Sequence, residues 1–413
     1  MRLTPAEETM LGGGVGEAVA FAMRILIQLG DLYGSKEFIP ISQVHVDGCC
    51  YQTAGDAGLD FAEKLASLGA RVAVPTTTNV SGRDIERWRE HRFPKGLAEK
   101  CRRMEAAYLS MGVIPTWTCA PYLAGPQPRF GEQIVWAESN AIAYVNSVIG
   151  ARTHRYGDYV DACAALVGRA PLFGLHLTEN RRASVLVRLE GFGPGLATDT
   201  SAWGLLGYRL GQDLGTRIPV IEGAPLQVTA DCLKAFSAAG AASGSLALFH
   251  MVGITPEAPS VRTALGGRKA VEEMTICLED LASIKHRLTG AREDRVDVVA
   301  LGCPHFSYQE ALNLARALAG RRVAKGVECF VYTSRAVLCD LRATGIAEDL
   351  EEAGVHLATD TCILHWPLER WGFSAMATNS AKLARYVPGL LGVPVRYGCL
   401  KECAEAAVTG RLP

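Results

Sequence analysis

Three cysteines of this chain follow short apolar segments, at points where strands are expected to end. They are Cys119, Cys303 and Cys362. Three thiolates can hold an iron–sulfur cluster and leave one iron open, and an open iron is a Lewis acid. Ligand sites form beyond the carboxyl ends of parallel strands, so the three loops could meet in one cleft. On spacing alone, three unrelated buried thiols are the simpler interpretation.

The local sequence around these cysteines favours shaped, exposed loops over a packed core. Cys303 is followed by Pro304 and His305, and Cys119 lies in a proline-bounded loop. Cys362 follows Asp360, a carboxylate that could orient ligands or substrate. Ligands of iron–sulfur clusters are held on such loops, with surrounding hydrogen bonds that tune the cluster.

A polar loop with five candidate residues follows an expected strand near residue 44. His45 is a candidate catalytic residue, although a lone histidine is more often a satisfied core residue. Asp47 adds a carboxylate, and Gly48 exposes backbone N–H groups that could bind an anion. Cys49 and Cys50 are adjacent, so their side chains rarely point at one metal, and we interpret them as pocket lining.

Further polar residues are candidates for substrate binding or acid–base chemistry. Asn79 ends a hydroxyl-rich stretch suited to a carboxylate or hydroxyl substrate, or to capping a strand. Glu138 could be an acid, a base or a ligand, or a surface carboxylate. Arg152 could clamp a carboxylate. Asn379 and Ser380, with Lys382, open an expected helix and form either an anion site or a simple cap.

Strand and helix patterns alternate along the chain, which favours an α/β fold with parallel sheets. We expect an N-terminal region at 1–128 with the substrate loops and the first cysteine, a middle domain at 129–290, and a C-terminal region at 291–413 with the other two. Thr4, Pro5 and Glu7 predict a helix start with a capping box. The expected strands are 38–44, 71–74, 112–114, 296–301, 327–332 and 355–358, and the expected helices are 57–68, 98–111, 308–319 and 334–353.

Composition limits the class of protein. The 413 residues are 49% hydrophobic and 21% charged, with a formal net charge of −1. The near-neutral charge gives no indication of a nucleic-acid partner, and no apolar run is long enough to predict a membrane span. Thirteen cysteines in a chain without an export signal indicate the reducing cytoplasm.

The order of these motifs resembles the catalytic large subunit of aconitase X, a branch of the aconitase superfamily of hydro-lyases. The resemblance covers nearly the whole chain. It rests on segments in one order: 3–7, 45–51, 55–58, 74–79, 118–122, 138–141, 146–147, 150–153, 302–305 and 378–382.

The resemblance implies an aconitase-like fold of three-layer α/β/α domains. It implies an iron–sulfur cluster, [4Fe–4S] or [2Fe–2S], held by Cys119, Cys303 and Cys362. It also implies substrate contacts from Gly48 to Cys50 and from Asn79 and Val80. Members of this family dehydrate cis-3-hydroxy-L-proline or, in archaea, mevalonate 5-phosphate.

One departure from the superfamily concerns a smaller swivelling domain that carries a catalytic serine. We find no such domain after Lys401 or before Met1, so we expect a separate small subunit to supply the serine. His45, Asp47, Glu138 and Lys382 are then the catalytic candidates of this chain. Arg152, Asn379 and Ser380 are candidates for holding substrate.

The substrate preference rests on Asp47, because the archaeal branch tends to have a serine there. An aspartate would repel a phosphate but could pair with the secondary amine of hydroxyproline. We therefore favour the hydroxyproline reaction over mevalonate 5-phosphate. Two other hypotheses are a non-enzymatic iron–sulfur sensor and a cysteine-nucleophile enzyme in which His305 serves Cys303 as base.

Overall fold

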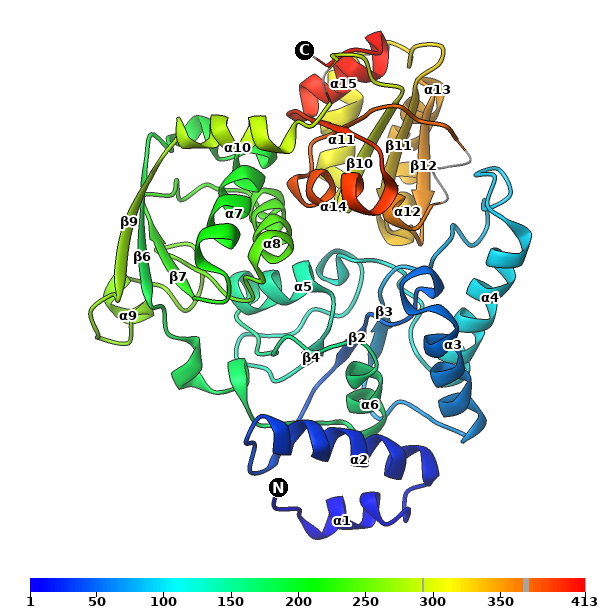
Figure 1. Ribbon diagram of the computed structural model, residues 1–413, viewed down its shortest axis with the longest axis vertical. Coiled ribbons are helices and arrows are strands. Elements are labelled where there is room, and N and C mark those ends of the chain that lie inside the picture. Colours follow the sequence, from blue (N-terminus) through cyan, green and yellow to red (C-terminus); the bar gives the residue numbers. More distant parts are fainter. Residues whose placement is uncertain (292, 367–370, 413) are drawn as a thin grey trace.

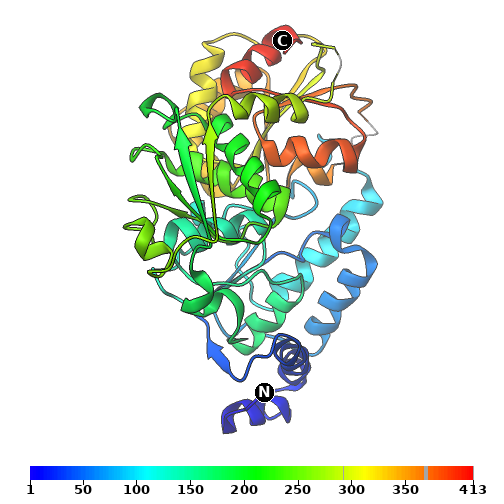
Figure 2. The same cartoon turned by 60° about the vertical axis from the view of Figure 1, so that its left-hand side comes forward.

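Three groups of strands and helices follow one another along the chain and pack around a shared centre (Figure 1). The computed structural model describes residues 1–291, 293–366 and 371–412. The N-terminal helices lie at one end of the molecule and the C-terminal helix at the other, as Figure 2 also shows. Among the named strands of the described residues, nearly every pairing is parallel, and β1 pairs with β5 antiparallel. The expected α/β class with parallel sheets is confirmed.

The first region is built on a three-stranded parallel sheet of order β3-β2-β4. Thr4 caps its first helix, and Glu7 completes the expected capping box. Its helices and strands are α1 Pro5–Leu11, α2 Glu17–Leu32, β1 Phe38–Pro40, β2 Val44–Val46, α3 Tyr51–Ser67, β3 Thr76–Thr78, α4 Lys95–Ser110, β4 Val135–Trp136, α5 Ser139–Tyr144, α6 Val160–Val167 and β5 Arg169–Pro171.

The first region extends further along the sequence than 128. Strand β4 pairs with β2, β5 pairs with β1, and α6 packs against α2 and β2. A break between these elements and the middle sheet falls after the short helix Thr178–Arg181. We therefore place the first boundary near residue 182, because sheet pairing joins residues that are distant in sequence.

The middle region is a four-stranded parallel sheet of order β8-β7-β6-β9. Helices α7 and α8 pack closely together and lie between this sheet and the third region (Figure 1). Its elements are β6 Val185–Glu190, α7 Thr200–Leu214, β7 Pro219–Glu222, α8 Ala230–Gly244, β8 His250–Met251, α9 Val261–Ala264, β9 Glu272–Cys277 and α10 Asp280–Leu288.

The third region is a five-stranded parallel sheet of order β12-β11-β10-β13-β14. Its strands are rich in buried Val, Leu and Ala, as expected of strands covered on both faces. Its elements are β10 Val298–Phe306, α11 Tyr308–Leu318, β11 Glu328–Thr333, α12 Arg335–Ala343, α13 Ile346–Glu352, β12 Val355–Thr359, β13 Met376–Thr378, α14 Ala381–Leu391, β14 Val395–Tyr397 and α15 Leu400–Thr409.

Local predictions were right for most helices and less exact for the strands. The stretch expected as one strand at 38–44 divides into β1 and β2, which belong to different sheets. The strand expected at 71–74 is wrong, since β3 forms at the threonines 76–78 instead. The segment 112–114 contributes only an isolated bridge from Ile114 to Thr77. The helix expected at 334–353 is two helices, α12 and α13, separated by Gly345 with a positive φ of 77°.

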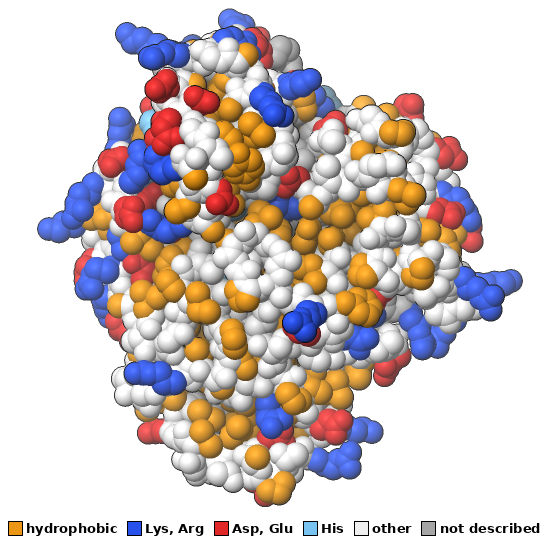
Figure 3. Space-filling model, turned by 180° about the vertical axis from the view of Figure 1, so that it is seen from behind, with side chains coloured by type: hydrophobic (Ala, Val, Ile, Leu, Met, Phe, Trp, Pro, Cys, Tyr) orange, Lys and Arg blue, Asp and Glu red, His pale blue; other side chains and the backbone are white. Residues whose placement is uncertain are grey.

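One hydrophobic core runs through all three regions and holds them together. It contains Trp136 of the first region, Trp203 of the middle region and Phe330 of the third, all fully buried. Lysine, arginine and acidic side chains are interspersed on the face seen in Figure 3. None of the described helices is long and apolar enough to cross a membrane.

Candidate active site

The three featured cysteines line one cavity of about 450 Å³ between the first and third regions. Cys119 comes from the loop after the isolated bridge at Ile114, just before the short helix Pro121–Leu123. Cys303 lies within β10, and Cys362 immediately precedes the short helix Ile363–His365 at the end of β12. Parallel strands deliver their carboxyl ends to one edge, which brings Cys303 and Cys362 together.

The donor set of this cavity fits an iron–sulfur cluster. In the described residues, no group of three or more His, Cys, Asp or Glu side chains is arranged to hold a metal ion. A cluster makes a different demand, because its thiolates are distributed over more than one iron and lie further apart than around a single ion. Three thiols from three separate loops around one cavity meet that demand.

Burial favours the protonated form of the free thiols of Cys119 and Cys303. It raises the pKa of the Cys303 thiol to about 12 and raises that of Cys119 as well. A nucleophilic cysteine needs the opposite, a depressed pKa beside a base. Metal coordination instead deprotonates a thiol outright. At Cys119 and Cys303 the electrostatics therefore fit metal ligands better than a lone nucleophile.

A chain of polar side chains crosses the same cavity from the first region to the third. Asn79 Nδ2 donates to Asp47 Oδ1 and, at 2.9 Å, to Glu138 Oε2. Lys382 Nζ donates to Glu138 Oε1 at 2.7 Å. Glu138 also caps α5, accepting from the Asn140 N–H at 3.3 Å. All four members of this chain line the cavity.

The charges along this row of polar side chains are unevenly compensated. Burial would raise the pKa of Glu138, but the Lys382 ammonium and its hydrogen bonds outweigh burial and hold that pKa below its usual value. Burial raises the pKa of Asp47 well above its usual value, and the nearby Glu138 and Asp158 carboxylates add to the rise. Asp47 therefore lacks a cation, and a positively charged ligand group would supply one.

Two aspartates that the sequence did not single out lie close to Asp47. Asp161 is fully buried, and its Oδ2 accepts the Asp47 backbone N–H at 2.7 Å. Asp158 is exposed at the cavity wall and packs over Gly48. A Cβ on Gly48 would lie 3.0 Å from the Tyr159 ring and 3.3 Å from Asp158 Cβ, so glycine lets this loop close.

The cavity brings together nine of the residues proposed from the sequence. They are Asp47, Cys50, Asn79, Val80, Cys119, Glu138, Cys303, Cys362 and Lys382. The sequence missed several other lining residues, including Gln52, Asp158, His365, Tyr386 and Leu390. Asp158 follows no expected strand, so strand-end reasoning offered no signal for it.

Six proposed residues do not line this cavity: His45, Gly48, Cys49, Arg152, Asn379 and Ser380. His45 is fully buried on β2, where its Nδ1 lies 2.8 Å from Thr77 Oγ1. Cys49 is buried, and its thiol donates to the Asn79 carbonyl at 3.4 Å. Arg152 lines a different cavity and donates to the His176 carbonyl and Thr178 Oγ1.

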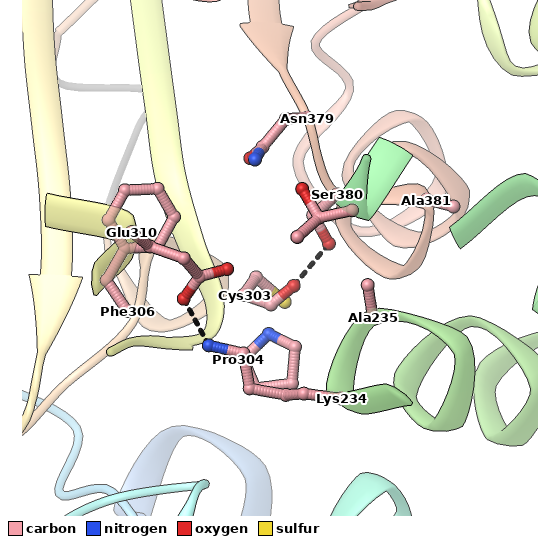
Figure 4. Close-up of a pocket in the computed structure, with 10 residues that line it drawn as sticks. Lys234, Ala235, Cys303, Pro304, Phe306, Glu310, Asn379, Ser380 and Ala381 are labelled. Atoms are coloured by element: carbon pink, nitrogen blue, oxygen red, sulfur yellow. Dashed lines mark hydrogen bonds and ion pairs between the residues drawn. The ribbon is translucent and has the colours of Figure 1, made fainter. Parts of the chain in front are cut away.

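Asn379 and Ser380 line a small chamber of about 20 Å³ that adjoins the cysteine cavity at Cys303 (Figure 4). Ser380 Oγ donates to the Cys303 carbonyl and accepts the Leu383 N–H at 3.1 Å, so it caps α14 while holding the cysteine loop. The expected helix start is confirmed, and its serine contacts protein backbone.

Comparison with known proteins agrees with this arrangement. The family models described as aconitase X first, second and third domain match residues 1–179, 183–286 and 296–409.

The chain belongs to the aconitase X family.

Relatives in the aconitase X family carry two different names. A cis-3-hydroxy-L-proline dehydratase of Pseudomonas aeruginosa is 45% identical, covering 100% of this chain and 71% of that protein. One of Hypocrea jecorina is 41% identical, covering 99% and 69%. A phosphomevalonate dehydratase large subunit of Methanothermobacter thermautotrophicus is 38% identical, covering 96% of each.

The fold is that of a solved aconitase X. The crystal structure of Thermococcus kodakaraensis aconitase X in its holo-form matches with a TM-score of 0.89 at 34% identity, covering 98% of this chain and 100% of that one. The expected aconitase-like α/β fold is thereby confirmed.

Proposed function

We propose that this chain is the large part of an iron–sulfur hydro-lyase that dehydrates cis-3-hydroxy-L-proline to pyrroline-2-carboxylate. The observation that carries the substrate choice is the pair Asp47 and Asp158, two acidic side chains on the wall of the cysteine cavity that form no ion pair within the described part of the chain. The secondary ammonium of a cyclic amino acid would neutralise them, whereas a phosphate would be repelled. The two dehydratase relatives that act on hydroxyproline by name support the same choice.

Cys119, Cys303 and Cys362 would hold the cluster, either [4Fe–4S] or [2Fe–2S]. When bound, the cluster supplies a Lewis acid that favours departure of the β-hydroxyl as hydroxide. Asp47, with Asp158 beside it, binds the substrate ammonium and fixes the orientation of the ring. Lys382 offers its ammonium to the substrate carboxylate while it neutralises Glu138. Asn79 fixes Asp47 relative to Glu138.

Removal of the α-proton requires a base, which we assign to a serine on a small swivelling-domain subunit. The enamine left after loss of water then tautomerises to the cyclic imine. Five relatives are named large subunits, which supports a partner of this kind. We place the reaction in the cytoplasm, where thirteen free cysteines and a cluster remain reduced.

Mevalonate 5-phosphate is the second candidate substrate. It is favoured by the phosphomevalonate relative that matches this chain over 96% of both lengths. The chemistry would be the same loss of a β-hydroxyl and an α-proton. The acidic wall at Asp47 and Asp158 weighs against it.

Anaerobic turnover assays of the cluster-loaded chain with its small subunit distinguish the two substrates. We expect turnover of cis-3-hydroxy-L-proline, and Asp47→Asn should lower kcat/KM about 10- to 100-fold, because a charged hydrogen bond contributes about 1.5–3 kcal/mol. Glu352→Gln, at an exposed position ending α13, is the matched control and should leave turnover unchanged. Turnover of mevalonate 5-phosphate alone would overturn the substrate assignment.

A further inference from the structure

The side chain of His305 connects the loops that carry the cysteines. The residue lies two positions after Cys303 on β10 and is fully buried. Its Nδ1 lies 2.9 Å from Oγ1 of Thr118, the residue before Cys119. Its Nε2 lies 2.9 Å from the carbonyl of Thr361, the residue before Cys362. One imidazole ring therefore bonds to the residues just before Cys119 and Cys362, and it lies on the same strand as Cys303.

The main chain of His305 is held at two further points. Its N–H donates to the Cys119 sulfur at 3.3 Å. Its carbonyl accepts from Lys234 Nζ at 3.0 Å, and the same ammonium pairs with Glu310 (Figure 4). Thr118, Lys234 and Thr361 belong to the first, middle and third regions, so contacts from all three regions converge on this residue.

The hydrogen-bond pattern fixes the tautomer of the ring. A carbonyl can only accept, so Nε2 carries the hydrogen and donates to Thr361. Nδ1 is then an acceptor for the Thr118 hydroxyl, which in turn accepts the Ala120 N–H at 3.1 Å. Both ring nitrogens are engaged away from the Cys303 thiol, and the ring does not line the cavity. This arrangement leaves no free nitrogen for a base role.

We propose that His305 is a positioning residue that sets the spacing of the three cysteine loops and thereby determines how firmly the chain retains its cluster. The inference rests on the proposed function, because it assumes that Cys119, Cys303 and Cys362 are the ligands. It also makes a claim about the loops themselves, which holds for the cluster-free protein.

Two substitutions at His305 separate the two ring contacts. The Gln amide reaches the position of Nε2, so His305→Gln keeps the donor to Thr361 and loses the acceptor for Thr118. The Asn oxygen lies nearer the position of Nδ1, so His305→Asn does the reverse. Thr118→Val removes the same bond as His305→Gln from the other side, together with the bond from the Ala120 N–H, so the double variant should be no worse than Thr118→Val alone.

The first measurement uses the anaerobically reconstituted chain with its small subunit. Loss of visible absorption in the presence of an iron chelator reports cluster retention, and iron and sulfide counts report loading. We expect each variant to lose its cluster about tenfold faster than wild type, the effect of about 1.4 kcal/mol. His176→Gln is the control, since His176 is equally buried and bonded to Tyr156 and Gln133 outside the cysteine cavity.

The second measurement uses the cluster-free protein and iodoacetamide. His305→Gln and Thr118→Val should speed alkylation of Cys119 selectively, and His305→Asn should speed that of Cys362. Wild-type retention and alkylation rates in the His305 variants, or an equal acceleration in His176→Gln, would overturn the positioning role. If wild type binds no cluster, the proposed function fails, and the alkylation rates still decide the inference.

Discussion

Asn79 donates through a single amide nitrogen to two carboxylates, Asp47 and Glu138. Two carboxylates held this close repel each other unless one is protonated or each has a cation. Lys382 neutralises Glu138, and Asp47 has no such partner among the described residues. The arrangement is therefore asymmetric, with one compensated and one uncompensated carboxylate. A ligand with a cationic amine completes it.

The support beneath Asp47 predicts a dependence of stability on pH. Burial raises the pKa of Asp161 to about 7, above its value in an unfolded chain. The folded state then binds the proton more tightly, so the stability from this group is present below about pH 4 and is lost as pH rises toward 7.

Asp161→Asn should remove this dependence. Urea denaturation across that window should show wild type losing stability relative to the variant, with each unit of pKa difference corresponding to about 1.4 kcal/mol. Asp60→Asn, at an exposed position on α3, should run parallel to wild type. A parallel curve for Asp161→Asn would contradict the assigned pKa.

Residue types at the ends of strands predicted much of the site. The proposals that failed concern side chains that are buried in the core or that point away from the cavity. Asp47 follows β2, Asn79 follows β3 and Cys362 follows β12 closely, and all three lie on the cavity with Cys119 and Cys303. His45 lies two residues before Asp47, within β2. Side chains alternate between the two faces of a strand, and that of His45 points into the core. Arg152 was proposed from its residue type alone, and the residue type does not determine which way a side chain points.

At the scale of elements, β10 depends on a glycine next to its cysteine. Gly302 has a φ of 96°, and a Cβ there would lie 2.1 Å from the Tyr332 carbonyl oxygen on β11. The register of β10 and β11 shifts between Leu301 and Phe306, at the point where Cys303 turns toward the cavity. The close approach of the two backbones therefore sets the course of the cysteine loop.

Gly302→Ala should destabilise the protein by about 2–5 kcal/mol, because it adds backbone strain and overpacking together. Denaturant unfolding measures the loss. Gly389→Ala is the matched control, since nothing lies within 4 Å of its added Cβ and it is exposed on α14. That change should stabilise by about 0.5–1 kcal/mol. Equal effects of the two changes would contradict the role given to Gly302.

Helices were predictable because their caps and periodicity are local in sequence. The capping boxes at Thr4 and Ser307 mark the starts of α1 and α11. Strands of two or three residues, such as β4 and β8, have no such local signal. They exist because a distant strand pairs with them, and a single sequence does not contain that information in any one window.

At the scale of the whole molecule, ion pairs of Arg335 with the buried Asp360 and with Glu86 connect the loop that carries Cys362 to the first region. Arg335 Nε donates to Asp360 Oδ1 at 2.8 Å, and its Nη1 donates to Glu86 of the first region at 2.6 Å. Asp360 is fully buried with a φ of 66° and accepts the Ile85 N–H at 3.2 Å. The carboxylate expected to orient a ligand or substrate instead orients its own loop across the region boundary.

Arg335→Gln should lower the stability of the whole chain by about 1–3 kcal/mol, because it leaves a buried carboxylate short of its partner. Amide hydrogen exchange should rise in residues 84–91, which dock on the end of β12 through Asp84 and Thr359. Arg342→Gln breaks exposed pairs within the third region and should change stability by less than about 0.5 kcal/mol. Unchanged exchange at 84–91 in Arg335→Gln would contradict the coupling.

The central claim is that Cys119, Cys303 and Cys362 together hold an iron–sulfur cluster. Its most direct test is the iron and sulfide content of the anaerobically reconstituted chain, with visible absorption as the second readout. Wild type and Cys339→Ser, at an exposed cysteine on α12, should load fully. Cys119→Ser, Cys303→Ser and Cys362→Ser should each load poorly or lose iron rapidly. A wild type without iron and sulfide, or a full cluster in all three serine variants, would contradict the account.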